Sequence, residues 1–457
     1  MNYIFDYFFS NKFINGFDIN KIPSNTIDKN LDADYIFTKS TKKFKDRNSV
    51  GVWSHPNEMN SPNTTFYSVY EILDNNNFIK EEYKDKKFFY KLDLFGSPAF
   101  SFPDNRDTME SIIDFTSYRV IDALKKNDNL FLLMSYYWEG ILAEHTIMLI
   151  HSKMWQYQIP TKKVVLSFGG FNQEEWYQSI CDKHKIKNKI NFHYHNWVWK
   201  TKGEEFWEYK NNKEYDKINS EYKIEKKKYD FNCLNRRLRT HRFYVLSRLE
   251  KEKLLDDNIV TYDFTIVENR PHLAEIPKIE QVTHEFDFTE LKSYLLYLQK
   301  YKDKKFYDYD DLENLHGIMH ERASVYENSM FSFVTETTYY SDEFYISEKT
   351  LKPIGHKHPF IIFGSVGTLK ELQRMGFKTF EPFIDESYDL ETNMQRRIDM
   401  IFDEVLKLVN KTDEEKLEWM KNIKPIVDWN SKKLEEIYFE SKNGAFTREK
   451  EIFKLIG

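Results

Sequence analysis

Four polar residues, Ser347, Glu348, Lys349 and Thr350, stand together between the aromatic and β-branched runs "FYI" and "PFIIFG". Ser347 is a good N-cap, so we expect a helix to begin here. The start of a helix offers unpaired N–H groups and a positive partial charge, which suit a phosphate, and Lys349 adds a full positive charge. Glu348 would repel a phosphate but could accept hydrogen bonds from a ribose. The pattern predicts a nucleotide site, although an ordinary capped helix with solvated charges would use the same residues.

A second charged stretch is "NCLNRRLRTHR", residues 232–242, in which four arginines follow an expected strand and lead into a helix. Loops of this kind lie at the carboxyl edge of a parallel sheet, where ligands bind. The planar guanidinium fork of arginine suits bidentate phosphate contacts, and Arg236 and Arg237 are the best placed. Cations in a first helical turn oppose the helix dipole, at a cost of up to about 1 kcal/mol each. We therefore weigh an anion-binding loop against a merely basic first turn.

A third stretch adds a carboxylate to the same region. Glu336 ends an expected strand, and Glu348 follows twelve residues later. The segments "VTETT" (334–338), "YISEK" (345–349) and "GHKHPFIIFG" (355–364) resemble the donor-binding region of the GT-B glycosyltransferases related to α-1,3-fucosyltransferases. That family carries Phe-Glu-Asn-Ser, then Tyr-(Val/Ile)-Thr-Glu-Lys, then a strand of the type Gly-Val/Pro-Val-Val.

The resemblance implies roles for individual residues. Tyr345 would contact the nucleotide, Glu348 the ribose and Lys349 the diphosphate, with Arg236 or Arg237 also on the diphosphate. The full expected donor-binding set is Arg236, Arg237, Glu336, Tyr345, Ser347, Glu348, Lys349 and Thr350. The chain departs from the family in a longer spacer between the acidic motifs and in Thr337, which replaces Asn. Pro353 is expected to shorten or kink the helix after Lys349.

A glycosyl transfer with inversion also needs a general base for the acceptor hydroxyl. We expect it in the N-terminal half, where "SYYWEG" places Glu139 just after an expected strand and beside aromatic residues that could bind a sugar. Asp93 and Asp104 are alternatives, and Glu139 could instead cap the following helix.

Metal chemistry is not expected from the sequence. The acidic run "YDYDD" (307–311) lies in a polar stretch rather than at the end of an apolar strand. His193 and His195 have no further ligand nearby, so a core or cleft role is favoured over metal binding. The leaving diphosphate would instead be stabilised by the arginines, Lys349 and a helix end, and no cofactor is implied beyond the nucleotide-sugar co-substrate.

The elements that must position these residues follow from apolar runs separated by helical patterns. Expected strands occupy residues 88–96, 129–137, 162–170, 189–197, 229–234, 258–264, 329–337 and 358–364. Expected helices occupy residues 143–157, 172–186, 240–255 and 367–376, and most of the chain after Glu391. We expect a Thr368/Glu371 capping box to begin the fourth of these helices. Strands and helices that alternate in this way are typical of parallel, doubly wound sheets.

The chain of 457 residues is long enough for two such domains. We expect an α/β protein with two Rossmann-like domains facing across a cleft, the arrangement of GT-B enzymes. Residues 1–200 would bind the acceptor, residues 201–228 would form a charged linker, and residues 229–457 would bind the nucleotide sugar and end in helices.

Composition limits the function classes. The net charge of −6 argues mildly against a nucleic-acid-binding protein. Two distant cysteines, Cys181 and Cys233, fit a reducing compartment. The N-terminus lacks a secretory pattern, and no apolar run approaches ~18 residues, so we expect no membrane span and a cytoplasmic location. For a viral protein this would be the host cytoplasm.

These observations favour a glycosyltransferase that moves a sugar from a nucleotide-diphosphate donor to a hydroxyl of a glycan. One alternative is an enzyme of the viral type that glycosylates hydroxymethylated bases in DNA, with the basic residues of 223–253 following the phosphates. The other is a nucleotide-binding protein without catalysis.

Overall fold

The structure is a computed structural model. It describes residues 2–5, 65–93, 113, 116, 118–136, 144–168, 173–194, 222–235, 240–261, 323–339 and 345–443. The chain divides into two compact units, residues 1–197 with 443–457, and residues 198–442. Each unit contains its own parallel sheet, so the expectation of an α/β protein with two such sheets is confirmed.

The first unit contains a six-stranded sheet in which every pair is parallel. Its strands are β1 (Asn2–Phe5), β2 (Thr65–Ser68), β3 (Phe88–Asp93), β4 (Leu130–Tyr136), β5 (Val164–Phe168) and β6 (Asn191–Tyr194). The spatial order is β2-β1-β3-β4-β5-β6. The order reverses at β1, as in doubly wound sheets that bind ligands at the switch point.

Helices of the first unit pack on this sheet. They are α3 (Val69–Ile72), α4 (Tyr118–Lys126), α5 (Glu144–Tyr157) and α6 (Gln173–Lys183), with short 3₁₀ turns η3 (Glu81–Tyr83) and η5 (Thr161–Lys163). The five residues from Leu130 to Met134 on β4 are all at most 6% exposed. Since successive strand residues point to opposite faces, both faces of the sheet are covered at β4. Continuous apolar runs therefore identified β3, β4, β5 and β6 correctly, whereas β1 and β2 were not among the expected strands.

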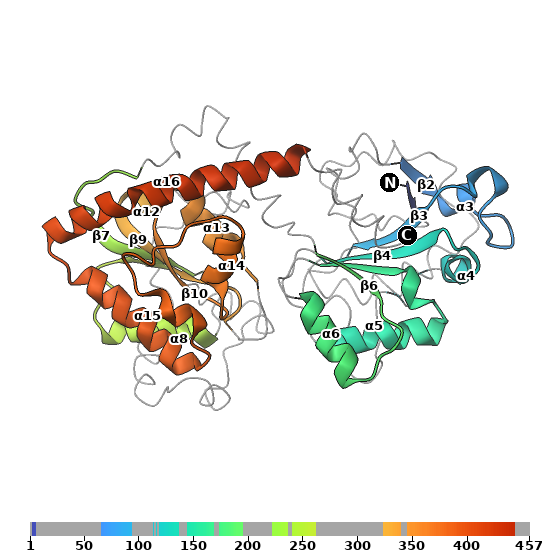
Figure 1. The fold of residues 1–457 in the computed structure, drawn as a ribbon, viewed down its shortest axis with the longest axis horizontal. Helices are drawn as coiled ribbons and strands as arrows, with labels where there is room; N and C mark the ends of the chain where they lie inside the picture. Colours follow the sequence, from blue (N-terminus) through green and yellow to red (C-terminus); the bar gives the residue numbers. More distant parts are fainter. Residues whose placement is uncertain are drawn as a thin grey trace. The chain divides into compact units, whose positions relative to one another are not determined.

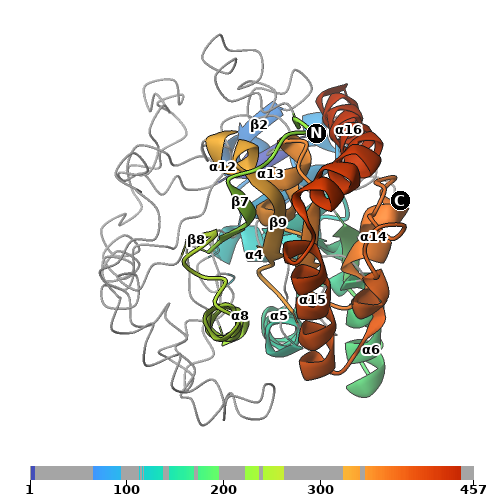
Figure 2. The same cartoon turned by 90° about the vertical axis from the view of Figure 1, so that its left-hand side faces the viewer.

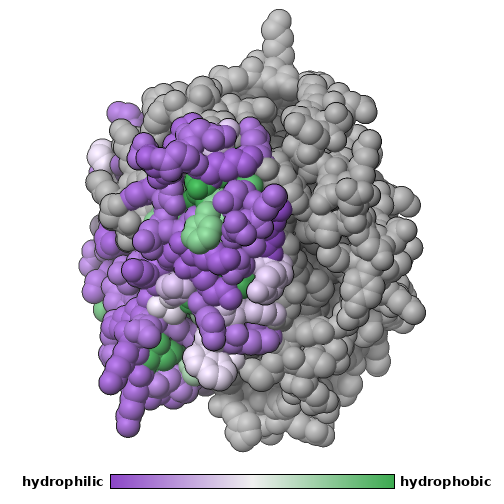
Figure 3. All heavy atoms as spheres, turned by 90° about the vertical axis from the view of Figure 1, so that its right-hand side faces the viewer, coloured by the Kyte–Doolittle hydropathy of each residue, from purple (hydrophilic) through white to green (hydrophobic). Residues whose placement is uncertain are grey.

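The described residues on the face that Figure 3 shows are largely polar. Figure 3 shows hydrophilic atoms over most of the coloured residues, with apolar atoms in small separate areas. Phe78, Tyr118 and Trp155 are exposed large side chains of this unit. Exposed apolar residues that are scattered singly are normal in folded proteins and do not mark a docking face.

The second unit contains a four-stranded parallel sheet. Its strands are β7 (Tyr229–Leu234), β8 (Ile259–Thr261), β9 (Ser329–Thr335) and β10 (Phe360–Phe363), in the spatial order β10-β9-β7-β8. The chain runs from β7 to β8 on one side and then returns to β9 on the other side of β7. The strand order thus reverses between β7 and β9, and ligands of such sheets bind outside the carboxyl ends of the strands at this point.

Helices cover both faces of the second sheet (Figures 1 and 2), with α12 and α16 on one face and α8 and α15 on the other. The helices are α8 (Thr240–Lys251), α12 (Ala323–Glu327), α13 (Glu348–Gly355), α14 (Thr368–Arg374), α15 (Met394–Val409) and α16 (Asp413–Asn443), with the 3₁₀ turn η7 (Glu386–Leu390). Phe333 of β9 packs edge-on against Phe402 of α15, with ring centroids 5.6 Å apart. All seven residues of β9 are buried, as expected for a central strand.

Two local predictions have different outcomes. Helix α13 ends at Gly355 with Pro353 in its last turn, so the expectation of a short helix is confirmed. The Thr368/Glu371 capping box is wrong, because the N-cap position of α14 is Gly367 and the Asp389 carboxylate accepts the N–H groups of Leu369 and Lys370. Glu371 instead pairs with Arg374.

We searched the described ranges for a helix whose length and apolar character would carry it through a bilayer and found none. The expected linker is described only over residues 222–228. The cleft expected between the two domains stays a prediction.

Candidate functional site

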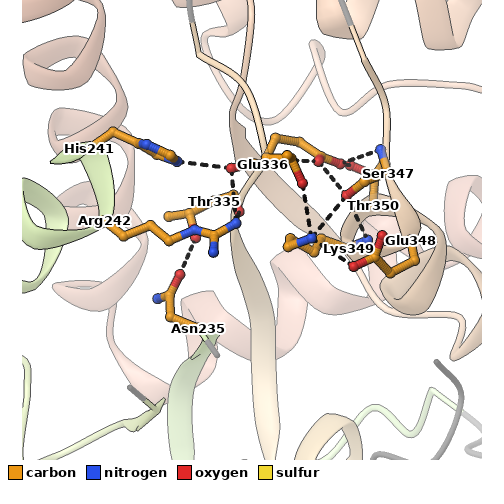
Figure 4. Close-up of polar contacts among 10 residues, drawn as sticks. Asn235, His241, Arg242, Thr335, Glu336, Ser347, Glu348, Lys349 and Thr350 are labelled. Carbon is orange, nitrogen blue, oxygen red and sulfur yellow. Dashed lines mark hydrogen bonds and ion pairs between the residues drawn. The ribbon is translucent and has the colours of Figure 1, made fainter. Parts of the chain in front are cut away.

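A polar cluster lies at the carboxyl ends of β7 and β9, where the strand order of the second sheet reverses (Figure 4). Asn235 follows β7, and its side-chain oxygen accepts the Thr335 hydroxyl of β9 at 2.5 Å. The Asn235 N–H donates to the hydroxyl of Thr261 on β8 at 2.9 Å. These contacts join the ends of three strands and therefore fix the positions at which the following loops begin.

The carboxylate of Glu336, the first residue after β9, is the centre of the cluster. One oxygen accepts the Ser347 N–H at 3.1 Å and the Thr350 hydroxyl at 2.5 Å. The other oxygen accepts the Thr337 N–H at 2.9 Å and the Ser347 hydroxyl at 2.5 Å. Glu336 is completely buried, and buried carboxylates are stable only with such partners. The side chain therefore ties the end of β9 to the start of α13.

Ser347 is the N-cap of α13, as expected. Its hydroxyl oxygen accepts the Lys349 N–H at 3.3 Å while its proton goes to Glu336. Ser347 and Thr350 are fully buried. Their hydroxyls therefore orient the helix within the protein, and the residues between them are presented at the helix start.

Glu348 and Lys349 lie between Ser347 and Thr350 in the first turn of α13. Their side chains are 28% and 21% exposed, respectively. The Lys349 ammonium lies 2.7 Å from Glu348 Oε1, 3.1 Å from Thr337 Oγ1 and 3.3 Å from Ser347 Oγ. Its three protons therefore point at three oxygen atoms, of which one belongs to a partly exposed carboxylate. A phosphate oxygen could replace that carboxylate without a change in the rest of the geometry.

The two charges shift each other's ionisation. Burial alone would raise the pKa of Glu348, but the charge and hydrogen bond of Lys349 lower it to about 2. Burial lowers the pKa of Lys349, while Glu348 acts in the opposite direction and the positive charge of Arg242 adds to the decrease. The pair is thus a charged one, held in a partly desolvated place.

Two residues of α8 approach the same strand end from the other side (Figure 4). His241 Nε2 lies 2.8 Å from the Glu336 carbonyl oxygen. Arg242 Nη2 donates to the carbonyls of Thr335 at 3.2 Å and Glu336 at 3.1 Å. Both side chains are at most 2% exposed. Sequence reasoning included Arg242 in the arginine-rich stretch but gave it no role, and His241 was missed.

The predicted donor-binding residues thus fall into groups. Glu336, Ser347 and Thr350 form the buried network, and Glu348 and Lys349 form the partly exposed pair. Tyr345 is 7% exposed, so most of its ring lies within the protein. Arg236 and Arg237 follow Asn235 in the sequence and lie outside the described residues. Their predicted phosphate contacts stay predictions, as do ligand contacts of the buried members.

The predicted general base is not described either. Glu139 and Asp104 lie outside the described residues, whereas Asp93 is the last residue of β3, next to the switch point of the first sheet. His193 lies inside this unit, with Nδ1 3.1 Å from the Ser167 hydroxyl, which fits the expected core role. His195 and the acidic run 307–311 are outside the described ranges.

Metal ligands were sought over the same part of the chain. Among the residues that the structure describes, no group of three or more histidine, cysteine or acidic side chains is arranged to hold an ion. The cluster around Glu336 offers one saturated carboxylate and one ion-paired carboxylate. It is better suited to an anionic ligand with hydroxyl groups than to a cation.

A comparison with protein-family models and with curated proteins found no match for this chain. A function must therefore be argued from the residues of the cluster and from their place in the sheet.

Proposed function

We propose that this protein is a glycosyltransferase that binds the nucleoside diphosphate of a nucleotide-sugar donor at the carboxyl edge of the second sheet. Lys349 would bind the diphosphate and Glu348 the ribose hydroxyls, as the sequence resemblance implies. The sugar would pass to a hydroxyl of a glycan. The second unit would then have the Rossmann-like role of a GT-B donor domain.

One observation carries the proposal: the buried Glu336 network holds Glu348 and Lys349 at the start of a helix, at the carboxyl edge of a parallel sheet, where sheets of this kind generally bind ligands. A carboxylate and an ammonium in these positions match the two halves of a nucleotide diphosphate. The helix start contributes a positive partial charge to the same region. A merely solvated pair would not need four buried hydrogen bonds beneath it.

Binding would exchange the partners of Lys349. Its ammonium now lies 2.7 Å from Glu348, and a phosphate oxygen would take that position. The released Glu348 carboxylate would then accept two hydrogen bonds from the ribose. Three charge-assisted hydrogen bonds, one from Lys349 to the phosphate and two from the ribose to Glu348, would replace the one charge-assisted bond of the present ion pair.

The transfer step would follow from these contacts. The acceptor oxygen attacks the anomeric carbon of the sugar, and the bond from that carbon to the terminal phosphate oxygen breaks. The electron pair leaves on the diphosphate, where Lys349 and the predicted arginines would stabilise it. The hydroxyl proton passes to a general base, for which Glu139 stays the prediction and Asp93 a described alternative.

A thermal-shift screen of the full chain against nucleoside diphosphates and their sugars tests the binding step. We expect nucleotides with one particular base to raise the unfolding temperature of the wild-type protein. The variants Glu348→Gln and Lys349→Met should each lose most of this increase. Lys370→Met, an exposed lysine of the neighbouring helix α14, is the matched control and should keep it. If no nucleotide shifts the wild-type protein, the proposal is wrong.

Incubation with the selected nucleotide sugar then separates an enzyme from a binding protein. An enzyme should release the nucleoside diphosphate at least slowly, because water can take the place of the acceptor and hydrolyse the donor. A binding protein without catalysis should leave the donor intact. The DNA-modifying alternative has less support here, because Lys226 and Arg248 of the basic segment pair with Asp413 and Asp399. Salt-sensitive binding of duplex DNA would favour that alternative.

A further inference from the structure

Arg242 of α8 is placed behind the candidate site rather than in it. The residue is 2% exposed, and one guanidinium nitrogen, Nη2, donates to two successive backbone carbonyls, those of Thr335 and Glu336. His241 holds the Glu336 carbonyl from the same helix at 2.8 Å. Nη2 carries two N–H groups in the fixed plane of the guanidinium, so this forked contact uses one of them for each carbonyl.

The contact leads directly to the site. The backbone of Glu336 is fixed by α8, and its side chain is fixed to Ser347 and Thr350 of the α13 start (Figure 4). Ser347 in turn contacts both the N–H and the ammonium of Lys349. A movement of the Glu336 backbone would therefore move the lysine that we expect to meet the diphosphate.

Arg242 also contributes charge. The charged groups of the described residues that face Lys349 are Glu348 of its own helix, Glu336 at the end of β9 and Arg242 of α8. Arg242 is the cation among these three groups, so Lys349 and Arg242 together give the cluster two positive charges. In a buried environment with a low effective dielectric, its attraction for an anion beside Lys349 is less screened than it would be at a surface.

We propose that Arg242 is a positioning residue for the anion-binding Lys349, fixing the end of β9 and placing a second positive charge behind the ammonium. This inference rests on the proposed function of Lys349 as a ligand of the donor diphosphate. Arg242 itself does not touch the donor in this scheme. It acts through Glu336, Ser347 and the electric field at Lys349.

The test uses inorganic pyrophosphate as the probe and the full chain with Arg242→Met, Arg242→Lys and Lys349→Met. Arg248→Met is the matched control, because Arg248 lies in the same helix but pairs with Glu252 and Asp399. Affinity is measured by calorimetry from pH 7 to about pH 10.5. In parallel, the rate of Lys349 acetylation over the same pH range, read by mass spectrometry, reports the ionisation of that lysine without any ligand.

We expect Arg242→Met to weaken pyrophosphate binding about tenfold, because the end of β9 is no longer held by α8 and the second positive charge behind Lys349 is lost. Removal of the nearby positive charge should also move the acetylation midpoint of Lys349 to higher pH. Arg242→Lys keeps the charge but not the fork, so it should weaken binding about threefold and leave the midpoint near its wild-type value. Arg248→Met should change neither readout.

The proposal would be overturned if Arg242→Met kept both the wild-type affinity for pyrophosphate and the wild-type pH midpoint of Lys349 acetylation. If that variant does not fold, Arg242→Lys decides, and wild-type affinity in it would count against a positioning role. If the wild-type chain binds neither pyrophosphate nor any nucleoside diphosphate, the proposed function fails. The acetylation profile would still show in that case whether Arg242 acts on Lys349.

Discussion

Glu336 is bound on two sides by different parts of the second unit. Its carbonyl oxygen accepts donors from α8, and its carboxylate accepts donors from the start of α13. Sequence reasoning placed Glu336 at the end of a strand and treated its carboxylate as a ligand for the donor. The four protein donors on that carboxylate favour a role in building the site, and a ligand would have to displace one of them.

Replacement of Glu336 by Gln should lower the free energy of unfolding by about 2–4 kcal/mol, because an amide turns two acceptor positions into donors that face other donors. The control is Glu371→Gln, which removes a buried glutamate whose partner, Arg374, is 68% exposed. Its cost should stay below about 1 kcal/mol. Denaturant unfolding measures both values, and similar costs for the two variants would contradict the assigned role.

Glu348 should make stability depend on acid pH. Its pKa in the folded protein is about 2, below the ordinary 4.5, since Lys349 favours the charged form despite burial. The stabilisation by Glu348 is therefore complete above pH 4.5 and is lost as the pH falls towards 2. The wild-type advantage over Glu348→Gln should be about 1 kcal/mol at pH 6 and should vanish near pH 2, as measured by unfolding. An advantage that is constant with pH would refute the assignment.

Helices α13 and α14 show which helix N-caps can be predicted from neighbouring residues in the sequence and which cannot. The N-cap of α13, Ser347, lies next to the helix that it begins, and the sequence predicted it correctly. The N-terminus of α14 is satisfied by Asp389, which lies within η7, about twenty residues farther along the chain. A capping-box pattern considers only residues within one turn, so it could not identify this partner.

Removal of the distant cap should cost more than removal of the local hydroxyl. We expect Asp389→Ala to destabilise the unit by about 2 kcal/mol, because two helix N–H groups lose their acceptor. Thr368→Val should cost about 1 kcal/mol or less, because the hydroxyl donates only to the Ser365 carbonyl. Equal losses in thermal unfolding would show that Thr368 is the true cap.

The site residues that the sequence identified are those whose partners are close along the chain. Ser347, Glu348 and Lys349 are consecutive and open a helix, so their types and spacing were informative. The role of Arg242 depends on backbone carbonyls more than ninety residues away, and backbone carbonyls carry no sequence signal. Its burial beneath the strand end could be recognised only in three dimensions.

For the whole molecule, apolar runs and helical patterns were sufficient to predict two parallel sheets. Eight expected strands correspond to β3–β10, with bounds that differ by a few residues. The strand order was not predicted, because any parallel pair can be joined by a helical crossover and the local pattern does not say which side the chain takes. The order is what places the ends of β7 and β9 at the switch point.

Buried titratable groups should set the pH dependence of the second unit. Burial lowers the pKa of His356 and His358 to about 3, so their stabilisation is present above pH 6.5 and is lost as the pH falls. Burial raises the pKa of Glu386 to about 7, so its stabilisation is present below pH 4.5 and is lost as the pH rises. Between about pH 5 and 5.5 the unfolded state binds about one more proton at these three groups than the folded state does, since it gains about two at the histidines and loses about one at Glu386.

Stability should therefore rise by about 1.4 kcal/mol per pH unit over this interval from these groups. His358→Asn should lower the slope by about that amount, and Glu386→Gln should raise it by the same amount. Denaturant unfolding at several pH values measures each slope. A slope that neither variant changes would show that these groups titrate normally in the folded protein.

The Glu336 cluster takes its members from α8, the end of β9 and the start of α13, so it exists only after the chain has folded. A small molecule that binds there has no matching surface on the unfolded polypeptide, and all of its binding energy resists unfolding. At one hundred times its dissociation constant this amounts to about 2.7 kcal/mol. Proteases that cleave only the unfolded protein would then degrade it more slowly at a high concentration of that molecule. The ligand concentration would therefore control the lifetime of the protein.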